Sequence, residues 1–162
     1  MFSAKSAGRV RLTLEHLEDR LCPTTYSMVD LLPPAGSTFS RAHGLNDTGL
    51  VVGDGFFAAG AQAVVWQPTS ATSAMPAILP GFPQGGPSSG GRDVNNQGAI
   101  AGNAYALVGT EQHVHATLWT GSPGSYVARD LGTPVGAFVY SDAVGLSEPD
   151  AQGTLWVAGY SA

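Results

Sequence analysis

Two histidines, His113 and His115, are the residues whose spacing most suggests chemistry. On a β-strand, residues i and i+2 point to the same face, so both imidazoles could reach one metal ion. A metal site needs at least a third ligand, and the nearest other histidine, His43, lies in a different unit of the chain. We therefore expect His115 to pack beside Trp119, with metal binding as the less favoured alternative.

Two aspartates, Asp47 and Asp54, flank a glycine hairpin and raise the question of calcium. A calcium loop of the EF-hand kind needs several spaced oxygen ligands and a distal glutamate, and this segment has neither. The corresponding positions of a second, similar segment hold Asn96 and Asn103. The sequence favours turn-forming roles for these residues, and we predict no metal ligands and no cofactor.

The candidates for acid–base or nucleophilic catalysis are equally weak. Glycoside hydrolysis needs two carboxylates about 5–10 Å apart, and nothing in the sequence brings Glu111, Glu148 and Asp150 together. Ser125 lacks the G-x-S-x-G elbow of a serine nucleophile. The glycine-rich segment 85–91 is followed by neither a helix nor a lysine, so it is no phosphate cradle. We predict no catalytic and no cofactor-binding residues, and a non-enzymatic protein.

Three tryptophans, Trp66, Trp119 and Trp156, recur near similar apolar segments. Exposed in a row they could stack against sugars, and buried they would be the largest core residue of each unit. Their recurrence at apolar strand positions favours the core.

Composition and charge argue against a nucleic-acid partner and against a transmembrane segment. The chain has 162 residues, 43% of them apolar, 12% charged and one a cysteine, Cys22, which leaves no internal disulfide. Its net charge is −5, and from residue 26 onward only Arg41, Arg92 and Arg129 oppose nine acids. An acidic body does not bind a phosphate backbone by counterion release, so we expect no nucleic-acid partner. No run of 18 apolar residues is present, so we predict no transmembrane segment.

The elements that would position these residues form an internal repeat. The segment LNDTGLVVG at 45–53 recurs as VNNQGAIAG at 94–102, at a shift of 49, and an altered copy lies at 143–159. A period near 50 with small-residue turns indicates stacked supersecondary units. We predict units at about 26–76, 77–127 and 128–162.

Short strands and glycine hairpins dominate each unit. In NDTG (46–49) and NNQG (95–98), the asparagine bonds its own backbone and the glycine adopts a positive φ. In the third unit the segment SEPDAQG (147–153) predicts a larger hairpin tip. The strands that we expect in each unit are one before the turn region (28–32, 77–79, 128–131), two flanking the turn (42–45 and 50–53, 92–94 and 99–102, 143–146 and 155–159) and one ending in tryptophan (63–66, 116–119). The sequence therefore predicts an all-β protein with about 11 short strands, the spacing of a sandwich, barrel or propeller.

The N-terminal residues 1–25 differ from this body in charge and pattern. Leu14, Leu17 and Leu21 fall on one face of a helix over 12–21, and Pro23 ends it. We expect a short amphipathic helix in a basic segment that is separate from the β domain at 26–162. No apolar stretch of an ordinary secretory signal is present.

The ordered set of hairpin, tryptophan strand and Asp-Leu-Gly strand resembles the bacterial HAF repeat. Residues His115–Trp119 match its His-Ala-Phe triplet and following Leu-Trp pair, with threonine in place of phenylalanine, while 62–66 has lost both His and Phe. Residues 130–133 match the family's DLGT, and 30–32 match it weakly. The resemblance covers about 26–160 and implies a propeller-like extracellular bacterial protein. With fewer than three full units, the propeller would be incomplete. No catalytic residues attach to the family.

The segment LTLEHLEDRLCPT at 12–24 is similar to the LExLEDRxxP segment that heads many large exported or surface proteins of bacteria. This resemblance implies a sorting role and a location outside the cell or at its surface. An amphipathic cap on the first strand is the alternative.

Together these features predict a non-enzymatic extracellular module with a structural or ligand-binding role at the bacterial surface. The alternative is a carbohydrate-binding or glycan-hydrolysing propeller with its site on the loops of one face. The apolar strand 155–160 has no following tryptophan strand. It would pair with 28–32 or with another chain, because open strand edges seek partners. We expect self-association, and a surface protein or glycan as the ligand.

Overall fold

The computed structural model describes residues 28–134 and 139–162, and within them the chain is all-β, with eleven strands and no helix. The strands are β1 (Asp30–Leu31), β2 (Phe39–Leu45), β3 (Val51–Phe57), β4 (Gly60–Pro68), β5 (Ser73–Ile78), β6 (Ser89–Val94), β7 (Ile100–Val108), β8 (Glu111–Thr120), β9 (Val127–Gly132), β10 (Ser141–Leu146) and β11 (Val157–Ser161). The predicted all-β class is confirmed. The helix predicted over 12–21 lies outside the described residues.

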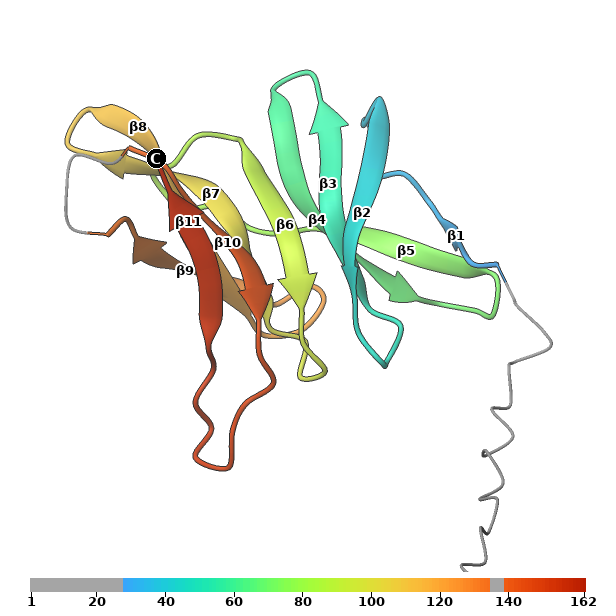
Figure 1. Ribbon diagram of the computed structural model, residues 1–162. Coiled ribbons are helices and arrows are strands. Elements are labelled where there is room, and N and C mark those ends of the chain that lie inside the picture. Colours follow the sequence, from blue (N-terminus) through green and yellow to red (C-terminus); the bar gives the residue numbers. More distant parts are fainter. Residues whose placement is uncertain (1–27, 135–138) are drawn as a thin grey trace, which may run out of the picture.

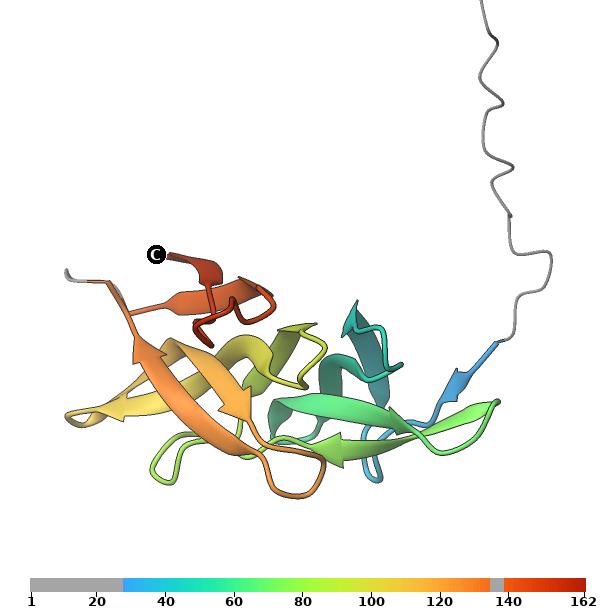
Figure 2. The same ribbon diagram turned by 90° about the horizontal axis from the view of Figure 1, so that it is seen from below.

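The strands form three sheets that follow one another in chain order (Figures 1 and 2). Strands β2 to β5 form an antiparallel meander, to which β1 adds in parallel at the β5 edge. Strands β6 to β9 form a second antiparallel meander, and β10 and β11 pair as a two-stranded third sheet. The first sheet is strongly twisted and curls like part of a barrel (Figure 1).

Glycine turns connect β2 to β3, β6 to β7 and β10 to β11. Gly49, Gly98 and Gly153 have φ values of 84°, 80° and 80°, which a residue with a side chain adopts only at a cost. The amide of each glycine donates to the carbonyl oxygen of the residue three before it, at 2.9–3.0 Å. The turns predicted at 46–49 and 95–98 are therefore confirmed.

A β-bulge interrupts β2, β6 and β10 at equivalent positions. The extra residues are His43 in β2, Arg92 in β6 and Val144 in β10. Directly before each bulge, the neighbouring strand places a glycine against the backbone of the first strand. Those glycines are Gly53, Gly102 and Gly159. A Cβ on any of them would lie 1.9–2.1 Å from a backbone carbonyl oxygen, so only glycine fits.

We call the face of a sheet that packs against the following sheet its forward face, and the face that packs against the preceding sheet its rear face. The forward face of the first sheet carries Leu50, Val52 and Asp54, and the rear face of the second sheet carries Ser89, Gly91 and Val94. A Cβ on Gly91 would lie 2.4 Å from the side chain of Val52, so these sheets approach closely. The main apolar core fills this contact and includes Val52, Val65, Val94, Ile100 and Trp119.

Two of the three tryptophans belong to the core. Trp66 and Trp119 are fully buried, and their Nε1 atoms donate to the carbonyl oxygens of Leu32 and Pro80 at 2.8 and 2.7 Å. The core prediction is confirmed for both. It is wrong for Trp156, which is 69% exposed because it directly precedes β11 on a face that no described strand covers.

The predicted units do not coincide with the sheets. Strand β5 spans the boundary predicted at 76/77, and β9 spans the one predicted at 127/128. The segments 77–79 and 128–131, expected to open a unit, instead lie in or directly after the last strand of a sheet. The reason is that the repeated sequence gives the length of one unit but not the residue at which a unit begins. That residue depends on which strands pair, and the pairing is non-local.

Strand β11 pairs only with β10 among the described residues, and β1 pairs with β5. The pairing of 155–160 with 28–32 that would close the chain internally is therefore not formed. No helix in the described part of the chain is long and apolar enough to span a membrane.

Candidate functional site

A ladder of side-chain hydrogen bonds joins the turns of the three sheets. Asn46 Oδ1 accepts from the backbone amides two and four residues later, at 3.1 and 2.9 Å. Its Nδ2 donates to the carbonyl oxygen of Asn95 in the second sheet, at 2.9 Å. Asn95 forms the same two bonds within its own turn, and its Nδ2 donates to the carbonyl oxygen of Ser147 in the third sheet at 3.1 Å. The amide side chain of asparagine supplies both the acceptor and the donor.

The tips of the turns are also bonded to one another. The backbone amide of Asp47 donates to Asn96 Oδ1 at 2.8 Å, and Asn96 Nδ2 donates to Asp47 Oδ2 at 2.7 Å. The backbone amide of Asn96 donates to Glu148 Oε1 at 2.7 Å. Two acids that the sequence raised as candidates, Asp47 and Glu148, thus hold neighbouring turns together.

The third hairpin extends beyond the first two. Ser147 Oγ accepts from the backbone amide of Trp156, nine residues later, where Asn46 accepts from a residue four later. At its end, Asp150 Oδ1 accepts from the amides of Gln152 and Thr154 at 2.9 and 2.8 Å, which is the same turn as in the other sheets. The predicted larger tip is therefore confirmed: residues 147–156 connect β10 to β11, whereas 46–50 and 95–99 connect the strands of the other two hairpins.

A buried ionic junction ties the three sheets together through β3, β6 and β10. Arg92 on β6 donates from its terminal nitrogen to Asp54 Oδ2 at 3.2 Å, and from Nε to Asp142 Oδ2 at 3.1 Å. The side chains of Asp54 and Asp142 are 6% and 2% exposed. His43 Nε2 lies 2.9 Å from Asp54 Oδ2. We call Asp54, Arg92 and Asp142 the Asp–Arg–Asp junction.

The electrostatics of the junction fix the arginine as a cation. Burial alone lowers the pKa of Arg92, but the attraction of Asp142 and Asp54 outweighs it, so the pKa is raised. Tyr140 donates to Asp142 Oδ2 at 3.3 Å, and burial together with its bond to Tyr160 raises the pKa of Tyr140. Asp142 Oδ1 is buried and has no hydrogen-bond partner among the residues that the structure describes. One guanidinium thus offsets the charge of two carboxylates that are buried against it.

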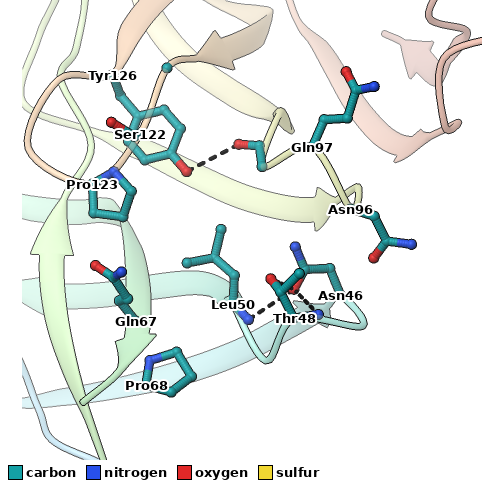
Figure 3. A pocket seen from close by; sticks show the side chains of 12 residues that line it. Asn46, Thr48, Leu50, Gln67, Pro68, Asn96, Gln97, Ser122, Pro123 and Tyr126 are labelled. Carbon is teal, nitrogen blue, oxygen red and sulfur yellow. Dashed lines mark hydrogen bonds between the residues drawn. The ribbon is translucent and has the colours of Figure 1, made fainter.

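A hollow of about 330 Å³ opens beside the turn ladder, between the first and second sheets (Figure 3). Its lining combines residues of two turns with the end of β4 and the loop between β8 and β9, and it contains no charged side chain. Tyr126 lies on its wall, and its hydroxyl donates to the carbonyl oxygen of Gly98 at 3.0 Å. Burial raises the pKa of Tyr126, which keeps the hydroxyl protonated as a donor. The neutral polar groups of the lining belong to Asn46, Thr48, Gln67, Asn96, Gln97 and Ser122. We call this hollow the turn-side pocket.

The two histidines on β8 each lie beside an acid, and their rings meet edge to face. His115 is buried, with Nδ1 2.9 Å from Asp130 Oδ2, and His113 Nε2 lies 3.7 Å from a Glu111 oxygen. Their ring centroids are 6.2 Å apart. Across residues 28–134 and 139–162, no group of three or more His, Cys, Asp or Glu side chains is placed to hold a metal ion. The His115–Asp130 pair joins β8 to β9, a partnership that sequence reasoning missed.

The three candidate catalytic acids do not converge. Glu111 begins β8 opposite Val108, at the far end of the nine-residue strand β7 from the turn that Glu148 contacts. At about 3.3 Å per residue, that strand separates them by about 25 Å. Asp150 is engaged by its own turn. Asp54, a calcium candidate with Asp47, lies in the ionic junction, whereas Asp47 lies at a turn tip.

The remaining sequence candidates have local structural roles. Ser125 Oγ lies 2.9 Å from Ser122 Oγ within their loop. The glycine-rich segment 85–91 leads into β6, where Gly90 and Gly91 permit the close approach of neighbouring strands.

Sequence reasoning missed Arg92 and Asp142 as partners, although one signal was available. Arg92 is one of three arginines beyond residue 26, and it follows His43 by the repeat shift of 49. A polar pair at equivalent positions of an apolar repeat indicates a shared structural position. Nothing local pointed to Asp142 or to the wall position of Tyr126.

The chain was also compared with known proteins. No family model, no curated protein and no solved structure matches it.

Proposed function

We propose that this chain is a non-enzymatic, propeller-like repeat module of the HAF type, with a structural or ligand-binding role at the bacterial cell surface. The observation that carries the proposal is the recurrence of the same contacts between successive sheets. Asn46 bonds Asn95 as Asn95 bonds Ser147. The amide of Ala63 donates to Ser89 Oγ at 2.9 Å, and the amide of Ala116 donates to Ser141 Oγ at 2.7 Å.

These contacts support a radial stack of sheets. In a propeller, four-stranded meanders surround an axis and the first strand of each lies innermost. Strands β2, β6 and β10 would take that position here, and the bulges at His43, Arg92 and Val144 would place three equivalent residues near the axis. The Asp–Arg–Asp junction would then link the inner strands β6 and β10 to β3, and His43 on β2 contacts it through Asp54.

The non-enzymatic role is supported by the use made of the polar residues. The acids best buried, Asp54 and Asp142, are bound to Arg92, and Glu148 and Asp150 accept from backbone amides. A carboxylate that already accepts structural hydrogen bonds is poorly placed to exchange a proton with a substrate.

The second candidate function is binding of an uncharged, hydroxyl-rich ligand such as a glycan, and the turn-side pocket favours it. Its wall offers amide and hydroxyl groups with one aromatic ring and no charge, which is the chemistry that orients sugars in clefts. The pocket lies at the turns and loops of one end of the sheets (Figure 3).

A glycan array combined with a panel of chromogenic glycosides separates these functions. We expect no hydrolysis, and any glycan bound through the pocket should lose about 5- to 150-fold in affinity in Gln97→Ala, since an unpaired polar contact costs about 1–3 kcal/mol. Gln152→Ala, at the tip of the third hairpin, is the matched control. Turnover of any glycoside that Glu148→Gln abolishes would overturn the non-enzymatic assignment.

The location is tested separately. Residues 1–25 resemble an export or sorting segment, so we expect a reporter fused to them to leave the cytoplasm of a bacterial host that recognises such segments. A fusion with Leu17→Asp and Arg20→Glu serves as the control. Retention of both fusions in the cytoplasm would remove the basis of the surface assignment.

A further inference from the structure

The two outermost faces of the row of three sheets, which are the forward face of the third sheet and the rear face of the first, are exposed where the inner faces are buried. On the first two sheets, the forward positions next to the turn are buried by the following sheet: Leu50 is 8% exposed. The equivalent position of the third sheet is Trp156, because Ser147 and Trp156 bond as Asn46 and Leu50 do. Trp156 is 69% exposed, and Tyr160, equivalent to the buried Asp54, is also exposed.

The rear face of the first sheet is also exposed, at the positions that the second sheet buries against the sheet before it. Ser40, Ala42 and Leu45 on β2 correspond by register to Ser89, Gly91 and Val94 on β6. Leu45 is 66% exposed, whereas Val94 is 5% exposed, because the first sheet covers β6 and no described strand covers this part of β2. An apolar hollow of about 520 Å³ lies beside it, lined by Leu31, Ala42, Leu45, Val51 and Ala74 among others.

The hydrogen-bonding groups of this open face match those used at the internal contacts. Ser89 and Ser141 each accept a backbone amide from the preceding sheet, and Ser40 occupies the same register position. The carbonyl oxygen of Asn95 accepts from the preceding turn, whereas among the described residues that of Asn46 accepts only from its own turn. The open rear face of β2 therefore continues the pattern of an interface that the chain forms twice.

We propose that the rear face of the first sheet, at Ser40, Ala42 and Leu45, is a docking surface for the third sheet of a second copy of this chain. The docking is head to tail, with Trp156, Ala158 and Tyr160 of one copy on β2 of the other. Strands β2 and β11 lie on opposite sides of β6 in both views, so one chain does not bring its own two faces together (Figures 1 and 2). Such a heterologous contact generates a closed ring or an open filament, according to the angle between copies.

Sedimentation velocity of the full chain over about two decades of concentration tests the proposal. The weight-average mass should rise with concentration from the 16.6 kDa of one chain to at least twice that value. Leu45→Asp and Trp156→Ser should each raise the dissociation constant at least tenfold, since each places a polar group in an apolar contact. Val127→Asp, at a residue as exposed as Leu45, is the matched control and should associate normally.

Mixing the two variants distinguishes head-to-tail docking from a symmetric contact. Leu45→Asp keeps its forward face and Trp156→Ser keeps its rear face, so an equimolar mixture should form heterodimers through one intact junction. A wild-type monomer at all concentrations, association unaffected by either variant, or a mixture that stays monomeric would each overturn the proposal. Circular dichroism checks folding, and Ala42→Glu replaces Leu45→Asp if that variant unfolds.

Discussion

Substituting Gly102 by alanine should destabilise the protein strongly, because a Cβ at this position would lie 2.0 Å from the carbonyl oxygen of Gly90. Real Cβ contacts stay above 3.0 Å, so β6 and β7 must separate by about 1 Å beside the bulge. Overpacking of this kind costs about 1–3 kcal/mol. Weakening one backbone hydrogen bond between β6 and β7 destabilises the protein by about 1 kcal/mol more. The lower conformational entropy of the unfolded chain with alanine stabilises the folded state by about 0.5 kcal/mol.

The expected net loss is therefore about 3 kcal/mol in the free energy of unfolding. Gly145→Ala is the matched control, since its Cβ would lie 3.7 Å from the Cβ of Ala158, an ordinary contact. Its φ is not positive, so we expect a change of less than about 1 kcal/mol, in the stabilising direction.

Urea unfolding followed by tryptophan fluorescence measures both changes. Trp66 and Trp119 are fully buried and report unfolding, so the Trp156→Ser background removes the exposed third fluorophore and weakens self-association. With an m-value of about 2 kcal/mol per molar urea, the Gly102→Ala midpoint should fall by about 1.5 M. Midpoints for Gly102→Ala and Gly145→Ala within about 0.3 M of each other would refute the packing argument.

Three further predictions concern the turns, the ionic junction and the N-terminal segment. Gly98→Val should cost more than about 1 kcal/mol, because a β-branched residue resists the φ of 80° while no atom closer than 3.6 Å obstructs it; an unchanged melting temperature would contradict the turn assignment. Arg92→Leu should cost about 3 kcal/mol in urea unfolding by leaving two buried carboxylates uncompensated, whereas the exposed Arg129→Leu should cost less than about 0.5 kcal/mol. A chain that begins at Thr24 should keep its β-type circular dichroism, since all described strands lie within 30–161; unfolding on truncation would place Leu14, Leu17 and Leu21 in the core.

The local features of the fold were predictable from the residues themselves. Asn46 and Gly49, like Asn95 and Gly98, specify a turn by side-chain bonding and positive φ within four residues. The all-β class follows from the spacing of such turns and the short apolar segments between them. Both depend on interactions between residues close in sequence, which a sequence pattern records directly.

Features that depend on distant strands were not predictable in this way. Trp66, Trp119 and Trp156 all lie in similar apolar segments. Those segments gave no indication that the first two would be buried and the third exposed. The junction of Asp54, Arg92 and Asp142 joins three sheets, and its residues carry no common spacing motif. Even the turn chemistry of the third hairpin was recognisable only in part, because Ser147 and Asp150 divide the roles that one asparagine has elsewhere.

By itself, then, the sequence determined where this chain turns, which segments are extended and that its body is acidic. Only the tertiary structure decided which sheet each strand joins, which acids are bound by Arg92 and which faces stay open. The physical reason is that turn geometry is set by φ, ψ and hydrogen bonds over a few residues, whereas burial and ion pairing are properties of the sheet that packs against a residue. That sheet comes from about 50 residues away along the chain.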